Sequence, residues 1–350
     1  TVCENVTEIP KLPQSLVCFI CSGSNLNLLP ELPQSLTELW CNGCSLLKSL
    51  PELPQSLEKL FCQCCPLLQF LPDLPQSLTE LWCNGCPLIR TVPDLPQSLT
   101  HIWCGGRTLL LSLPDLPQSL IYLNCNGCPL QSLPELPQSL GELNCSECPL
   151  LQTLPKLPQT LIYLNCSDCP LLTTFPALPQ TLIEFSCHGC LLLQSLHNLP
   201  QSLIELYCYE CPLLQTLPEL PQLLTILWCS DCPLLQSLPT LPQSLTTLWC
   251  CECPLLQSLP TLPQSLTDLN CEDCTGLIFI PKNAIEYISP KLLETINFNY
   301  LKWRHEQTLK HFSSTHGLAY EELVKKTWHP SRIVDWCWDT EEVKWFKSLK

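Results

Sequence analysis

The sequence predicts a mainly β repeat solenoid followed by a small α-helical C-terminal region. The phrase Leu-Pro-Gln-Ser-Leu, or a one-letter variant, occurs thirteen times from Leu12 to Leu262, at spacings of 21 residues and twice 20. Apolar residues recur at the same offsets in every unit, so a unit can bury its apolar face only against its neighbours. We therefore expect the solenoid over residues 1–280 and a second region over residues 281–350.

Each unit contains one expected strand and one expected return segment. In the second unit, Leu36, Leu39, Cys41, Cys44 and Leu46 occupy the inward positions, and the alternation around Leu39 is typical of a short strand. The prolines of the following Leu-Pro-Glu-Leu-Pro fix φ and remove backbone donors, so the return segment should be extended or polyproline-like. Stacked units then form a curved array with a parallel sheet on the concave side.

This unit resembles a known family. The pattern L-P-x-L-P-x-S-L-x-x-L is similar to the short leucine-rich repeat of effector proteins that enteric bacteria inject into host cells, over residues 1 to about 280. The variant Cys-x-x-Cys-Pro-Leu-Leu and the tail HPSRIVDWCWDTEEVKWF more closely resemble repeat proteins of giant DNA viruses of amoebae. Cys44 and its equivalents replace the asparagine of the bacterial pattern. The resemblance implies a recognition scaffold without chemistry of its own.

Most of the 29 cysteines fall into two columns at inward positions. The strand column has one cysteine in every unit: Cys21, Cys41, Cys62, Cys83, Cys104, Cys125, Cys145, Cys166, Cys187, Cys208, Cys229, Cys250 and Cys271. The turn column, three residues further on, has Ser24 and Arg107 as exceptions and otherwise consists of Cys3, Cys44, Cys65, Cys86, Cys128, Cys148, Cys169, Cys190, Cys211, Cys232, Cys253 and Cys274. Only Cys18, Cys64, Cys251 and Cys337 lie outside these columns.

Three interpretations of the cysteine columns are open. Cys-x-x-Cys pairs on adjacent units supply four thiolates for zinc, and stacked turns bring alpha carbons within disulfide range. Alternatively, the thiols are reduced and buried, because an interior column that repeats every turn needs a residue of constant, modest volume. A turn-column thiol then donates weakly to a carbonyl, in place of asparagine. We expect this last arrangement, with no metal and no cofactor.

Two further columns should face solvent on the concave side. The second concave column directly precedes the strand cysteine: Ile20, Trp40, Phe61, Trp82, Trp103, Asn124, Asn144, Asn165, Ser186, Tyr207, Trp228, Trp249 and Asn270. The first concave column lies two residues earlier and includes Glu38, Lys59, Glu80, His101, Tyr122, Glu142, Tyr163, Glu184, Glu205 and Asp268. Two aromatic blocks thus flank a polar centre.

The aromatic residues of these columns are the candidate binding site. Exposed tryptophan and tyrosine dominate the energetics of protein interfaces, which favours partner binding. Ring contacts between neighbouring strands also stabilise a sheet, so a purely structural role is the competing interpretation. The candidate partner-binding residues are Trp40, Phe61, Trp82, Trp103, Tyr122, Tyr163, Tyr207, Trp228 and Trp249.

The charge of the array narrows the class of partner. Residues 281–350 hold 11 Lys or Arg and 9 Asp or Glu, so the other 280 residues hold 6 basic and 23 acidic side chains, a formal charge of −17. Such a surface repels phosphate backbones and anionic lipids, which predicts no nucleic-acid or membrane binding. Acidic residues also follow the strands as a rim at Glu147, Asp168, Glu210, Asp231, Glu252 and Asp273, where a basic or mixed-charge protein would bind.

The region after residue 280 is expected to be helical. Ser289-Pro290 is typical of a helix start, and Leu293, Ile296 and Tyr300 follow at helical spacing. Further helices are expected over residues 319–327 and from about residue 339. An exposed solenoid end needs a cap, so this region is either a cap alone or a docking module.

Motifs for catalysis are absent from the sequence, which predicts a non-enzymatic protein. We find no Gly-rich phosphate loop, no H-E-x-x-H and no G-x-S-x-G. The alternative is a ubiquitin-ligase-like effector, because the resemblance to bacterial effectors includes ligases with a Cys-x-Asp nucleophile, and Cys337-Trp338-Asp339 matches it. A structural or virion-associated array is a third possibility. The N-terminus lacks a signal-peptide pattern, so we expect an intracellular protein, in the host cytoplasm if it is viral.

Overall fold

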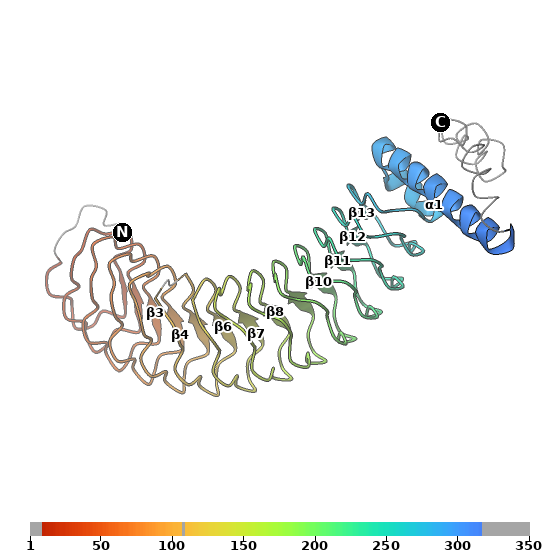
Figure 1. Ribbon diagram of the computed structural model, residues 1–350. Helices are drawn as coiled ribbons and strands as arrows, with labels where there is room; N and C mark the ends of the chain where they lie inside the picture. Colours follow the sequence, from red (N-terminus) through yellow and green to blue (C-terminus); the bar gives the residue numbers. More distant parts are fainter. Residues whose placement is uncertain (1–8, 107–108, 317–350) are drawn as a thin grey trace.

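The computed structural model describes residues 9–106 and 109–316. The described residues up to 281 form one curved array of stacked turns (Figure 1). Each turn contributes one three-residue strand: β1 Cys18–Ile20, β2 Glu38–Trp40, β3 Lys59–Phe61, β4 Glu80–Trp82, β5 His101–Trp103, β6 Tyr122–Asn124, β7 Glu142–Asn144, β8 Tyr163–Asn165, β9 Glu184–Ser186, β10 Glu205–Tyr207, β11 Ile226–Trp228, β12 Thr247–Trp249 and β13 Asp268–Asn270. All pairs are parallel, and the sheet order follows the chain from β1 to β13. The predicted solenoid is confirmed.

In each strand only the central residue points inward, and the cysteine that follows the strand points inward as well. Leu39 and Cys41 are completely buried, whereas Glu38 and Trp40 on either side of Leu39 remain partly exposed. Pairing is in register, so Leu39 lies opposite Leu60 and Trp40 opposite Phe61. Each inward side chain therefore packs on its counterpart in the next unit, which gives one continuous core.

The repeated phrase Leu-Pro-Gln-Ser-Leu forms the turn that leads into each strand. The amide of Leu36 donates to the carbonyl of Pro33 (3.1 Å), and the Leu36 side chain is fully buried. The serine hydroxyl joins consecutive units, because Ser56 Oγ donates to the Leu36 carbonyl of the preceding unit at 2.7 Å. Proline closes the turn, leucine fills the core and serine satisfies a carbonyl that the turn leaves without a backbone donor.

The return segments on the convex side are extended, as their prolines predict. No helix occurs between residues 9 and 281 in the part of the chain that the structure describes. Neighbouring return segments approach closely enough for isolated parallel bridges, such as Ser195 with Thr216 and Thr216 with Ser237. Leucines of these segments, for example Leu50 and Leu53, close the core from the convex side.

One inward position was predicted wrongly. Leu46 is 44% exposed, and Leu47 instead is fully buried. The chain makes a turn directly after Cys44, closed by the Leu47 amide donating to the Cys44 carbonyl at 3.3 Å. This turn moves the inward position one residue along the chain and leaves the preceding leucine on the flank of the array.

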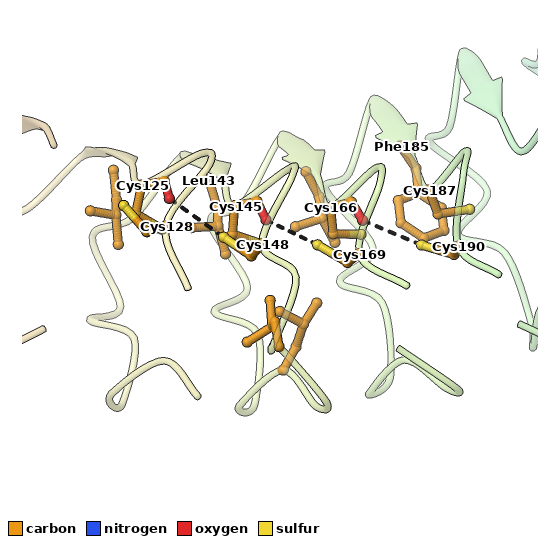
Figure 2. Close-up of a cluster of buried hydrophobic side chains, with 14 of the residues drawn as sticks. Cys125, Cys128, Leu143, Cys145, Cys148, Cys166, Cys169, Phe185, Cys187 and Cys190 are labelled. Atoms are coloured by element: carbon orange, nitrogen blue, oxygen red, sulfur yellow. Dashed lines mark hydrogen bonds between the residues drawn. The ribbon is translucent and has the colours of Figure 1, made fainter. Parts of the chain in front are cut away.

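The described cysteines of both columns lie inside the core with free thiols. Every described turn-column cysteine donates to the carbonyl of the strand-column cysteine in the preceding unit, at 2.9 to 3.5 Å. Figure 2 shows three steps of this ladder, including Cys169 to Cys145 at 3.2 Å. No disulfide joins any of the described cysteines. The thiol therefore makes the hydrogen bond proposed for it in place of asparagine.

The array is followed by a 3-10 helix, η1 (Lys282–Tyr287), and by α1 (Pro290–His316). The predicted helix start is confirmed, because the Leu292 amide donates to Ser289 Oγ at 3.2 Å, the contact of an N-cap residue. The helices expected at residues 319–327 and near 339 lie outside the described residues. Within the described ranges, no helix is both long and apolar enough to cross a membrane.

Burial predicts which thiols react in the native protein. Among the described cysteines, iodoacetamide at neutral pH should label exposed Cys64 first, whereas the described cysteines of both columns should react only after unfolding. Cys18 is also exposed, but burial and the charge of Glu38 raise the pKa of its thiol, so less thiolate forms and labelling should be slower. Peptide mapping by mass spectrometry checks this order. Labelling of Cys148 as fast as Cys64 in native protein would contradict it.

Candidate protein-binding surface

Eight of the nine candidate residues are partly exposed on the concave side of the sheet. They are Trp40, Trp82, Trp103, Tyr122, Tyr163, Tyr207, Trp228 and Trp249. The ninth, Phe61, is only 5% exposed, because it lies between Trp40 and Trp82 on the neighbouring strands. It acts as a spacer between these tryptophans, and its expected exposure on the concave face was wrong.

The N-terminal aromatic block is a continuous row of ring contacts over β2 to β6. Trp40 stacks on Phe61 with ring centroids 3.9 Å apart, and Trp82 meets Trp103 edge-on at 4.1 Å. Tyr122 extends the row from the first concave column, 5.3 Å from Trp103. Lateral stabilisation of the sheet is thus one role of these rings, while the outer ring surfaces stay accessible.

The C-terminal aromatic block contains two residues that sequence reasoning missed. His188 stacks on Tyr209 at 4.1 Å, and Tyr209 stacks on Trp228 at 4.4 Å. Trp228 in turn meets Trp249 at 4.6 Å. His188 and Tyr209 lie one residue after the strand cysteine, a position held in most other units by serine, asparagine, glycine or glutamine. Large rings at that small-residue position were the available signal.

The polar centre of the second concave column is less exposed than expected. Asn124 and Ser186 are each 6% exposed and therefore buried. The asparagine oxygens are used locally, since Asn144 Oδ1 accepts from the Ser146 amide at 3.0 Å and ends the strand. Ser186 Oγ lies 2.7 Å from Ser167 Oγ. Asn144 and Asn165 remain partly exposed, so the second concave column contributes only part of the expected polar surface at the centre.

Carboxylates of the first concave column anchor several rings. Trp40 Nε1 donates to Glu38 at 3.1 Å, and Tyr207 Oη donates to Glu205 at 2.7 Å. Trp249 Nε1 donates across strands to Asp268 at 2.9 Å. These bonds fix the polar edge of each ring and leave its apolar surface outward, an arrangement suited to contact with a protein.

Comparison with solved structures identifies the family of this chain. The leucine-rich effector protein YopM from Yersinia pestis is 30% identical, with a TM-score of 0.53, over 75% of this chain and 85% of that chain. This chain belongs to the leucine-rich repeat proteins. YopM from Yersinia enterocolitica is 31% identical, with a TM-score of 0.62, over 77% of this chain and 62% of that structure.

The cysteine ladder has a parallel among other leucine-rich repeat structures. The functional domain of InlJ from Listeria monocytogenes, described as including a cysteine ladder, is 20% identical with a TM-score of 0.56, over 76% of this chain and 62% of that chain. At this identity the likeness concerns the fold alone. No family model matches the chain, and no match was found among curated proteins.

The acidic rim lies at a backbone position that favours glycine. The second residue after each strand cysteine has a positive φ. In six units of this chain that residue is glycine. Six others place an acidic residue, at φ between 52° and 55°: Glu147, Asp168, Glu210, Asp231, Glu252 and Asp273. The last four are on consecutive units, and the charge of Asp231 raises the pKa of the Glu252 carboxyl. Both backbone strain and like-charge repulsion therefore oppose these residues.

The ubiquitin-ligase-like alternative cannot be placed on this surface. Its candidate motif, Cys337-Trp338-Asp339, lies outside the described residues. Among the described residues, no three His, Cys, Asp or Glu side chains are arranged to hold a metal ion.

The strain at the rim gives a stability prediction. Asp231→Gly should raise the free energy of unfolding by about 1 kcal/mol, because glycine adopts positive φ without a Cβ penalty. The matched control is Gly85→Ala, which should be destabilising, since its Cβ would lie 3.3 Å from Cys64 Sγ at φ +68°. Urea unfolding followed by circular dichroism measures both. A destabilised Asp231→Gly variant would show that the carboxylate stabilises the turn.

Proposed function

We propose that this leucine-rich repeat protein is a non-catalytic scaffold that binds a protein partner through its concave face. The main support for this proposal is the pair of aromatic blocks. Most of their rings are partly exposed, and carboxylates accept hydrogen bonds from the ring nitrogens of Trp40 and Trp249. A row needed only for lateral packing does not require tryptophan at positions open to solvent. Tryptophan and tyrosine with accessible faces are the residues that supply most binding energy at interfaces.

The charge of the concave face supports a basic or mixed-charge partner. Lys59 is paired with Glu80 at 2.8 Å, which leaves little positive charge on this face. The same charge disfavours nucleic acid and anionic membranes as ligands. If the resemblance to giant-virus proteins holds, the partner is a host protein in the host cytoplasm. Reduced, buried thiols are consistent with an intracellular compartment.

Affinity capture with matched variants tests this function. The concave variant replaces Trp40, Trp82, Trp103, Trp228 and Trp249 by serine and should lose a partner that the intact chain retains. The control variant replaces an equal number of exposed flank leucines by glutamine and should retain it: Leu46, Leu88, Leu150, Leu171 and Leu255. Circular dichroism must show both variants folded, and the purified partner is then titrated against each. Equal affinity for both variants would reject the concave face as the binding surface.

We also infer that residues 281–316 cap the C-terminal end of the array. Tyr287 Oη donates to the Leu266 carbonyl at 3.1 Å, the position that a serine hydroxyl of a following unit would take. Asn299 Nδ2 donates to the carbonyls of Thr275 (2.7 Å) and Leu277 (3.0 Å). Ile288, Leu292 and Ile296 are buried in the core cluster, and they cover its last apolar layer.

The capping role predicts a loss of stability without a loss of partner. Tyr287→Phe combined with Asn299→Ala should lower the free energy of unfolding by about 1 to 3 kcal/mol, because carbonyls of the last unit lose their donors. Ser56→Ala, which removes one equivalent bond inside the array, is the reference. If the double variant keeps full stability but loses the partner, the region is a docking module.

A further inference from the structure

The centre of the concave face carries an alternation of tyrosine and glutamate. In-register pairing places Tyr163 of β8 directly between Glu142 of β7 and Glu184 of β9, and Glu205 of β10 follows. All four side chains are partly exposed. Their neighbours in the second concave column, Asn144, Asn165 and Ser186, have shorter side chains, and Ser186 is buried.

Within residues 9–106 and 109–316, no basic side chain forms an ion pair with the carboxylates of this centre. Among the described residues, neither Glu142 nor Glu184 forms a hydrogen bond or an ion pair, and Glu205 accepts only from Tyr207. Burial, together with the charges of Glu205 and Glu142, raises the pKa of the Glu184 carboxyl. Keeping these carboxylates ionised therefore opposes stability, and a cation bound between them would relieve the repulsion.

Tyr163 differs from the other concave aromatics because its ring has no aromatic neighbour in the described part of the chain. The rings of both aromatic blocks contact one another, either stacked, as Tyr209 on Trp228, or edge-on, as Trp82 against Trp103. An unstacked tyrosine ring flanked by carboxylates is a favourable surface for a cation, because the ring face is negative and the carboxylates add charge at its edges.

The spacing of these groups selects the shape of the cation. Glu142 and Glu184 are two strands apart, which separates their alpha carbons by about 9.6 Å. These two carboxylates therefore lie on opposite sides of the Tyr163 ring. A planar guanidinium has donors on opposite edges, so it can donate to both carboxylates while its face lies on the ring. An ammonium is a compact charge without a flat face to stack on that ring.

We propose that Tyr163, Glu142 and Glu184 bind an arginine side chain of the protein partner. This assignment rests on the proposed function, since it names the chemistry by which the concave face would recognise a basic segment. The guanidinium stacks on the Tyr163 ring and donates to Glu142 on one side and Glu184 on the other. The aromatic blocks on either side then contact apolar residues that flank the arginine.

The test compares three fluorescein-labelled peptides of nine residues, in which glycines separate three arginines, three lysines or three citrullines. Fluorescence anisotropy at about 150 mM salt should show the arginine peptide binding tightest and the citrulline peptide not at all. Tyr163→Leu should weaken arginine-peptide binding about fivefold, whereas Tyr163→Phe, which keeps the ring, should not. Glu142→Gln with Glu184→Gln should weaken it further.

The control for general charge is Glu135→Gln with Glu219→Gln in the return segments, which removes the same charge from the convex side. It should leave arginine-peptide affinity unchanged. Equal binding of the arginine and lysine peptides, or an equal loss in the control variant, would overturn the arginine assignment. Either result leaves the proposed function standing if the five-tryptophan variant still loses the partner. A partner unaffected by that variant contradicts the proposed function even where the peptide binds at Tyr163.

Discussion

In-register stacking of identical turns is the constraint on which the rest of the structure depends. Each inward side chain has its own counterpart about 4.8 Å away on either side, so any inward residue must pack against itself. Leucine and cysteine both meet this requirement, since both are buried at the same positions in successive units. The turn-column thiol adds a hydrogen bond to the preceding unit, and the serine of Leu-Pro-Gln-Ser-Leu adds another. The core packing and the hydrogen bonds between units therefore repeat together, once in every unit.

The repeated core and backbone could be predicted from the sequence, because stacking requires the same inward side chains in every unit. Burial of both cysteine columns, the parallel sheet and the extended return segments all follow from a single averaged repeat. Leu46 shows the limit of this approach, because its exposure depends on one turn after Cys44 that shifts the inward position by a residue.

The concave surface could be predicted only in part from the sequence, because burial there depends on neighbouring side chains of different sizes. Phe61 is buried by the larger rings of Trp40 and Trp82, which no rule of alternation contains. Asn124 is buried although its position points outward in other units. His188 and Tyr209 enter the C-terminal aromatic block from a third column, which a scan limited to two columns passes over. What differs between units, and not what they share, shapes this face.

Pairing of each strand only with its chain neighbours has a consequence for how such a protein changes over time. Removal or duplication of one whole unit preserves most inward contacts, because most units carry the same leucines and cysteines at these positions. The distance between Tyr163 and either aromatic block would then change by one strand spacing, without redesign of the core. Recombination between units can therefore change the spacing of the recognition groups in steps of about 4.8 Å, the distance between neighbouring strands.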